Sequence, residues 1–138
     1  MRIMAIDYGD AHIGVAISDP TGFLTGFTTT ITAYRPDAVA ERITALAREH
    51  GVEELVLGHP RNMDGTRGPR AEKAEALAEL LRESTGLPVV LWDERRTTID
   101  AHQILFNAGK NGKQRKKTVD AVAASLILEG YLTFKKGK

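Results

Sequence analysis

The chain has 138 residues, 42% of them hydrophobic, with a formal net charge of +1 and no cysteine. This length predicts one domain that buries about two thirds of its unfolded surface, and the lack of cysteine excludes disulfides and thiolate metal sites. Apolar runs stay far below the roughly 18 residues of a membrane span, and the N-terminus reaches Asp7 without a signal-peptide layout. We therefore expect a cytoplasmic protein that does not associate with a membrane.

The first part of the chain predicts three strands joined by short turns. Residues 2–7 are an apolar run, and the next run, 13–19, follows so closely that the two predict a hairpin. A third, threonine-rich segment over 27–33 follows a turn that contains glycine. These three neighbours are expected to be antiparallel, because short turns join antiparallel strands.

From Pro36 the apolar period changes from two to about 3.6, which predicts a helix that ends at Gly51. The expected elements after it are a strand over 52–58, a helix from about 69 to 84, a strand over 87–92, a helix over 97–109 and a helix from about 119 to 132. The fold class is α/β: a mixed sheet of about five strands, the first three antiparallel, with helices on both faces. A basic tail is expected from about residue 133.

Three acidic residues stand at the rim of this predicted core. Asp7 closes the first strand, Glu94 follows the strand that ends at Trp92, and Asp120 opens the predicted last helix. Ligands bind at the carboxyl ends of parallel strands, and carboxylates gathered there would repel one another unless a cation neutralised them. Carboxylate oxygens without histidine or thiolate favour Mg²⁺ or Mn²⁺ over zinc.

Each acid also has a structural explanation, and for any one alone that explanation is favoured. Asp7 can shape the turn after its strand, Asp120 can be stabilised by a helix dipole, and Glu94 can pair with a neighbouring arginine. Their joint placement favours the metal site. Asp93 and Glu94 are neighbours that point to opposite faces of a strand, and the apolar period leaves open which of them reaches the site.

Basic residues flank the acidic centre in two predicted loops, over 59–68 and 110–117, and directly after Glu94. The candidate nucleic-acid-binding residues are Arg61, Arg67, Arg95, Arg96, Lys113, Arg115, Lys116 and Lys117. A nucleic-acid backbone placed between the loops would bind in a salt-dependent way, whereas a solvated loop explains either run taken alone. Tyr8 is expected in the core or a turn, and His59 is the one histidine placed at the mouth of the crevice.

Four blocks of this sequence resemble a known family. DYGDAHIGVAISD, GHPRNMDGTRG, DERRTT and TVDAVAASLILEGYL are similar, in order and spacing, to the signature blocks of the YqgF family, also called RuvX, over essentially the whole chain. The resemblance implies a ribonuclease H-like fold with Asp7, Glu94 and Asp120 as catalytic residues and metal ligands. His12, His59 and Glu129 depart from the usual pattern without removing an expected ligand.

The same resemblance implies a metal-dependent endonuclease that hydrolyses phosphodiester bonds with two Mg²⁺ or Mn²⁺ ions. The expected role is processing of the 5′ end of pre-16S rRNA in ribosome biogenesis, with structured RNA as the partner. A Holliday junction resolvase acting on branched DNA is the alternative within nucleases. The chain is expected to be a monomer or a homodimer, and a resolvase that cuts symmetrically requires the two-fold dimer.

Two other classes of protein compete with a nuclease. The block DYGDAHIGVAISD also resembles the phosphate-holding hairpin of sugar kinases and actin-like ATPases, but the chain is too short for the two lobes that close around ATP. The non-enzymatic alternative is an RNA-binding protein or transcription factor in which the acids only hold the fold together.

Overall fold

The computed structural model describes residues 1–8, 12–22, 24–33, 35–59, 68–93 and 112–136, and within the last range it describes side chains for 122–135. The elements in chain order are β1 (Arg2–Tyr8), β2 (His12–Ser18), β3 (Thr25–Thr32), α1 (Pro36–His50), β4 (Val52–His59), α2 (Pro69–Thr85), β5 (Val89–Asp93) and α4 (Gly112–Lys136). The strands form a single sheet in the order β3-β2-β1-β4-β5.

The sheet is mixed, as the sequence predicts. β1 pairs antiparallel with β2, and β2 pairs antiparallel with β3. β4 lies parallel to β1, and β5 lies parallel to β4. The carboxyl ends of β1, β4 and β5 therefore meet at one edge of the sheet, which we call the carboxyl edge; it ends with Tyr8, His59 and Asp93.

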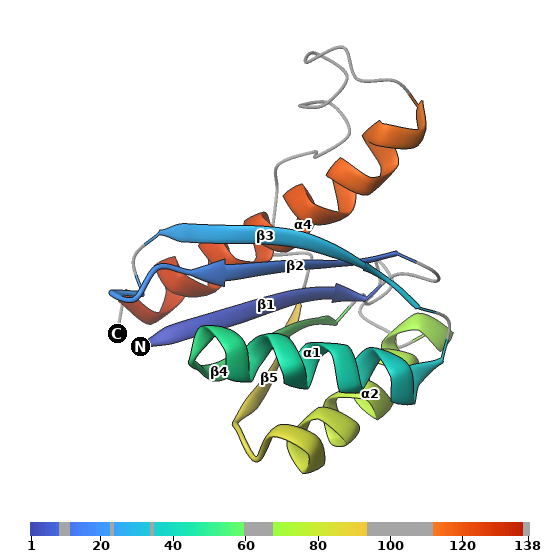
Figure 1. Cartoon of the computed structure of the whole chain (residues 1–138), viewed down its shortest axis with the longest axis horizontal. Coiled ribbons are helices and arrows are strands. Elements are labelled where there is room, and N and C mark those ends of the chain that lie inside the picture. The colour runs from blue at the N-terminus through green and yellow to red at the C-terminus, as the bar shows by residue number, and fades with distance from the viewer. Residues whose placement is uncertain (9–11, 23, 34, 60–67, 94–111, 137–138) are drawn as a thin grey trace.

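Successive side chains along each strand point to opposite faces of the sheet, so the interior consists of two apolar cores. Met4 and Ile6 of β1 belong to the core that α1 and α2 cover. Ile3 and Ala5 of β1, with Trp92 of β5, belong to the core that α4 covers. Figure 1 shows α1 and α2 in front of the sheet and α4 behind it, so the predicted helices on both faces are confirmed.

Proline and glycine set the ends of the two front helices. Pro36 and Pro69 occupy the first turns of α1 and α2, where their missing N–H groups cost nothing. Gly51 and Gly86 follow the last turns with φ of 66° and 70°, a left-handed conformation that glycine adopts without strain. The sequence predicts these bounds to within a residue of those observed.

The last helix begins seven residues earlier than the sequence predicts. α4 starts at Gly112, so residues 112–117 of the predicted basic loop are helical, and the helix continues to Lys136 through most of the predicted tail. Lysine, arginine and glutamine are good helix formers, which explains why a charged run extends the helix. Although α4 has 25 residues, no helix in the described part of the chain is long and apolar enough to cross a membrane. The predicted helix over 97–109 lies outside the described residues.

Candidate active site

Asp7 lies half-buried at the carboxyl edge, where strand alternation places it on the face of the sheet that α4 covers. Its antiparallel partner on β2 is Gly14. On β4, Gly58 is the next residue past the parallel pair formed by Ile6 and Leu57. Neither glycine has a side chain, and glycine inside a strand often marks a close approach by a ligand. The neighbouring positions on both adjacent strands therefore carry no side chain beside Asp7, an arrangement that is not apparent before the strand register is known.

β5 ends with one acid, Asp93, at the carboxyl edge. Trp92 packs in the core beneath α4, so Asp93, the next residue, belongs to the opposite face. Asp93 is also the cross-strand partner of His59 on β4. This arrangement removes Asp93 from the face that carries Asp7. Glu94 lies outside the described residues.

α4 packs against the sheet through one stripe that includes Ala124, Ile127, Leu128 and Tyr131. Position 120 precedes Ala124 by about one helical turn and therefore shares this stripe. Because α4 begins at Gly112, Asp120 is well inside the helix. The helix-dipole explanation for this acid is wrong, since that effect falls off within the first turn.

The Asp7 carboxylate is a ligand of the kind that suits a hard divalent cation. Carboxylate oxygens are the ligands that Mg²⁺ and Mn²⁺ prefer, and the glycines at the neighbouring strand positions place no side chain beside it. Asp7 therefore fits such an ion. Within the ranges described above, no three His, Asp or Glu side chains are grouped so as to hold a metal; Asp7 is the one predicted ligand whose side chain lies in those ranges.

The predicted basic residues fall into two groups. Arg61, Arg67, Arg95 and Arg96 lie outside the described residues. Lys113, Arg115, Lys116 and Lys117 lie on the first turns of α4, where the backbone alone is described. The second group was predicted to lie on a loop. It occupies instead the one to two helical turns that precede Asp120, so the cations and the acid share one rigid element.

His59 does not reach the crevice mouth, and that expectation is wrong. The residue is 5% exposed, and its Nε2 lies 2.7 Å from Oε2 of Glu75 on α2. Leu57 faces the core beneath α1 and α2, so a residue two positions later faces the same way. Tyr8 is partly buried against this core, which confirms its expected packing role. Nothing in the sequence around Glu75 marks it as the partner of His59.

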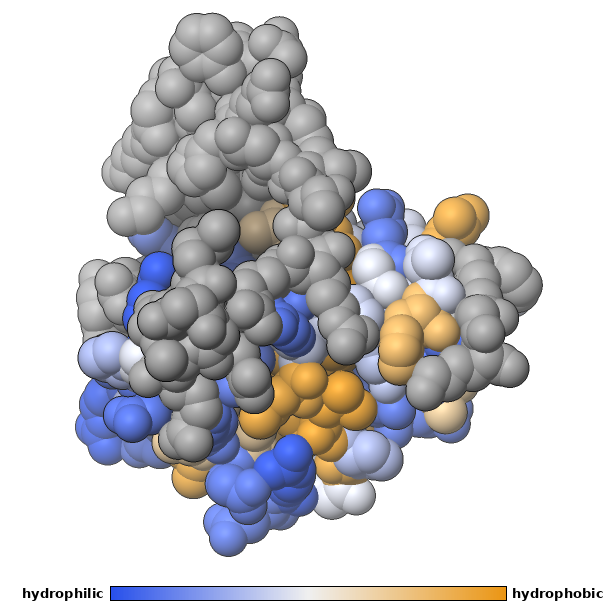
Figure 2. All heavy atoms as spheres, turned by 180° about the vertical axis from the view of Figure 1, so that it is seen from behind, coloured by the Kyte–Doolittle hydropathy of each residue, from blue (hydrophilic) through white to orange (hydrophobic). Residues whose placement is uncertain are grey.

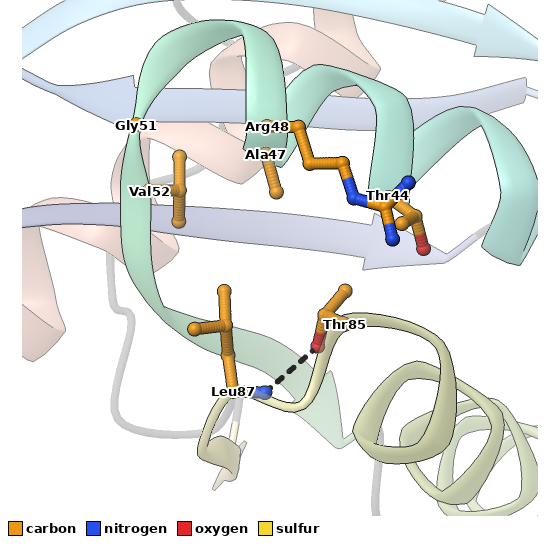
Figure 3. Close-up of a pocket in the computed structure, with 7 residues that line it drawn as sticks. All are labelled: Thr44, Ala47, Arg48, Gly51, Val52, Thr85 and Leu87. Carbon is orange, nitrogen blue, oxygen red and sulfur yellow. Dashed lines mark hydrogen bonds between the residues drawn. The ribbon is translucent and has the colours of Figure 1, made fainter.

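A small cavity between the last turns of α1 and α2 lies at the opposite end of the strands (Figure 3). Its volume is about 170 Å³, and its lining residues are Thr44, Ala47, Arg48, Gly51, Val52, Thr85 and Leu87. The Leu87 N–H donates to Thr85 Oγ1 over 3.1 Å at its rim. The cavity lies at the end of the strands away from Asp7, so it is separate from the carboxyl edge.

The fold resembles two solved structures. "T. thermophilus RuvC in complex with Holliday junction substrate" matches with a TM-score of 0.63 and 15% identity, over 97% of this chain and 96% of that chain. A ROK hexokinase from Thermus thermophilus matches with a TM-score of 0.50 and 23% identity, over 70% of this chain but 36% of its own. At these identities the likenesses show the fold alone, and it is a ribonuclease H-like α/β fold.

Sequence relatives define the family. The family model described as "RuvX: Holliday junction resolvase" matches residues 1–134. A "Putative pre-16S rRNA nuclease" of Halothermothrix orenii is 46% identical over 134 residues, 97% of this chain and 96% of that protein. A protein of the same name from Geobacillus kaustophilus is 44% identical over 138 residues, 99% of this chain and 100% of its own. The chain belongs to the RuvX family.

Proposed function

We propose that the protein is a metal-dependent endonuclease that hydrolyses phosphodiester bonds and processes the 5′ end of pre-16S rRNA. The observation that carries the proposal is the place of Asp7: a half-buried carboxylate at the carboxyl edge, on the face beneath α4, with glycines on both neighbouring strands. Relatives that are 44–46% identical over nearly the whole chain carry the name of a pre-16S rRNA nuclease, which supports the substrate.

Asp7, Glu94 and Asp120 would hold two Mg²⁺ or Mn²⁺ ions. When bound, such ions supply Lewis-acid stabilisation of the charge that develops on the phosphate and the leaving oxygen. Strand alternation supports this ligand set, because a residue two positions after Trp92 would face the same side as Trp92 if the strand geometry continued. The stripe shared by position 120 and Ala124 supports the third ligand.

The basic residues would hold the nucleic-acid backbone around these acids. Positions 113 and 117 precede Asp120 by about two turns and one turn on the same stripe of α4. Arg95 and Arg96 adjoin Glu94 in the chain, and a guanidinium can bind a phosphate through two parallel hydrogen bonds. Arg61 and Arg67 would contact the strand from the loop that follows β4. Binding should therefore weaken steeply as salt rises.

Cleavage assays with two substrates test the proposal. The full chain is given a precursor 16S rRNA fragment and, separately, a four-way DNA junction, each with Mg²⁺ or Mn²⁺. We expect cleavage of the RNA, loss of that cleavage in Asp7→Asn, and an unfolding midpoint close to that of the wild type. Asp37→Asn is the matched control, because Asp37 is an exposed acid on the first turn of α1 that pairs with Arg35; it should cut normally.

The other outcomes distinguish the competing functions. Cleavage of the junction but not of the RNA would support the resolvase, which the family description names; a stable two-fold dimer in sedimentation would accompany it. If the wild type cuts neither substrate and Asp7→Asn unfolds, the acid has a structural role and the non-enzymatic reading holds.

A further inference from the structure

Three aromatic rings cluster where β5 meets the last turns of α4. Trp92 makes edge contacts with Tyr131 and Phe134, at centroid distances of 5.5 Å and 5.4 Å. Tyr131 and Phe134 lie 6.4 Å apart with an interplanar angle of 25°. Trp92 and Tyr131 are buried, whereas Phe134 is 39% exposed. The cluster therefore presents one ring to solvent on a rigid base.

This cluster lies on the face of the molecule that α4 covers. Figure 2 shows that face, and apolar surface is open to solvent there among hydrophilic side chains. Phe134 is one of the few large apolar residues in the described part of the chain that are exposed. A single exposed apolar side chain is ordinary on a protein surface. The charged side chains beside Phe134 are therefore needed to indicate whether this ring binds a ligand.

A fixed cation adjoins the aromatic rings. Lys135 Nζ lies 2.9 Å from Glu54 Oε2 and 5.6 Å from the centroid of the Tyr131 ring. The Tyr131 hydroxyl donates to the same carboxylate oxygen over 3.2 Å. Glu54 thus holds Lys135 and Tyr131 in place from β4. The final stretch, 130–138, reads GYLTFKKGK and contains two further lysines, Lys136 and Lys138, but no acid.

We propose that Phe134 and Lys135, supported by Trp92, Tyr131 and Glu54, bind a single-stranded segment of nucleic acid outside the cleavage site. A base stacks on the exposed face of Phe134, and the adjoining phosphate lies beside Lys135. Exposed aromatic rings next to cations are the combination with which proteins bind unpaired strands, because every base has a π-face and every linkage has a charge. The inference rests on the proposed nuclease function, since it assigns a second contact to the same substrate.

The spacing along α4 sets the length of strand that reaches this site. Phe134 follows Asp120 by fourteen residues on one helix, which is about 21 Å along the axis at 1.5 Å per residue. A stacked strand covers that distance in about six nucleotides at 3.4 Å each. This length is an upper limit, because Trp92, which touches Phe134, is two residues from Glu94. A substrate with about six or more nucleotides on this side of the cut reaches Phe134.

Trp92 provides a direct probe of binding. It is the one tryptophan of the chain, and it touches the Phe134 ring. The full-length protein is titrated, without divalent metal, with an unpaired RNA oligonucleotide twice the length of that span, and Trp92 fluorescence is followed. We expect a saturable change. Phe134→Leu weakens binding about 10-fold, which corresponds to ~1.4 kcal/mol, whereas Phe134→Tyr keeps the ring and retains the affinity.

Two further variants separate stacking from charge and from general effects. Lys135→Gln weakens binding and lowers the slope of log affinity against log salt by about 0.7 for a single strand. Phe27→Leu is the matched control, because Phe27 is 40% exposed but lies on β3, where its ring contacts that of His50 on α1. Its affinity should equal that of the wild type. DNA of the same sequence should bind about as well as RNA, because the contacts are to base and phosphate.

The proposal fails if Phe134→Leu, folded as judged by its unfolding midpoint, binds the oligonucleotide with the affinity of the wild type. It also fails if the affinities for RNA and DNA of the same sequence differ more than tenfold. Its failure is distinct from failure of the nuclease function, since binding is measured without cleavage. A wild type that binds but never cuts would overturn the nuclease alone. In the cleavage assay, Phe134→Leu should cut substrates longer than the span less efficiently than the wild type does.

Discussion

Replacing Glu75 is expected to destabilise the chain more than replacing its partner His59. The His59 side chain is 6% exposed and that of Glu75 is 30% exposed, with 2.7 Å between Nε2 and Oε2. Glu75→Leu leaves the buried imidazole nitrogen without this carboxylate, which costs about 1–3 kcal/mol. His59→Leu places an apolar side chain in an apolar site and leaves Glu75 able to reach water, so we expect a cost below about 1 kcal/mol.

Urea unfolding of the two single variants and of the double variant measures this difference. The midpoints should fall while the slope stays that of the wild type, because the exposed surface changes little. The double variant should be more stable than Glu75→Leu alone, since it removes the buried polar group together with its partner; the coupling energy from the double-mutant cycle gives the size of the effect. A cost for His59→Leu equal to or above that for Glu75→Leu would refute this reasoning.

Two further predictions concern the packing and the protonation of α4. Leu128→Ala removes a fully buried side chain and should cost about 2–5 kcal/mol in urea unfolding, against less than about 0.5 kcal/mol for the exposed neighbour Glu129→Ala; equal costs would contradict the packing of α4 on the sheet. Burial, with the nearby Glu54 carboxylate, raises the pKa of Tyr131 to about 12. The neutral phenol therefore contributes fully to the free energy of unfolding below about pH 10, the pKa of the phenol in the unfolded chain. This contribution is lost as the pH rises through the pKa of the folded protein. Glu54→Gln should lower the Tyr131 pKa in a tyrosinate absorbance titration but leave it raised, because burial is the larger cause; an unchanged pKa would refute the role of Glu54.

The sheet and the two front helices could be predicted from the sequence because local signals determine them. Pro36 and Gly51 bracket α1 in the chain as they do in the structure. The antiparallel pairing of the first three strands followed from the short turns between them. The start of α4 was predicted wrongly, because a run of positive charge was interpreted as a loop although its residues favour a helix.

The candidate site was less predictable because it depends on which face each residue takes. β5 is apolar on both faces, so its sequence does not say whether Asp93 or its neighbour points toward α4. The packing of Trp92 beneath α4 settles the face of Asp93. The burial of His59 against Glu75 likewise depends on α2, a contact across sixteen residues. The glycines beside Asp7 become visible only when the strand register is known.

Binding of Mn²⁺ by calorimetry tests the central claim most directly. The wild type and three single variants, Asp7→Asn, Glu94→Gln and Asp120→Asn, are titrated with the ion after their unfolding midpoints are measured. If the three carboxylates share the ions, each variant should lose binding strongly while remaining folded, and the exposed control Asp37→Asn should bind like the wild type. Unchanged Mn²⁺ affinity in any one of the three would contradict the shared site.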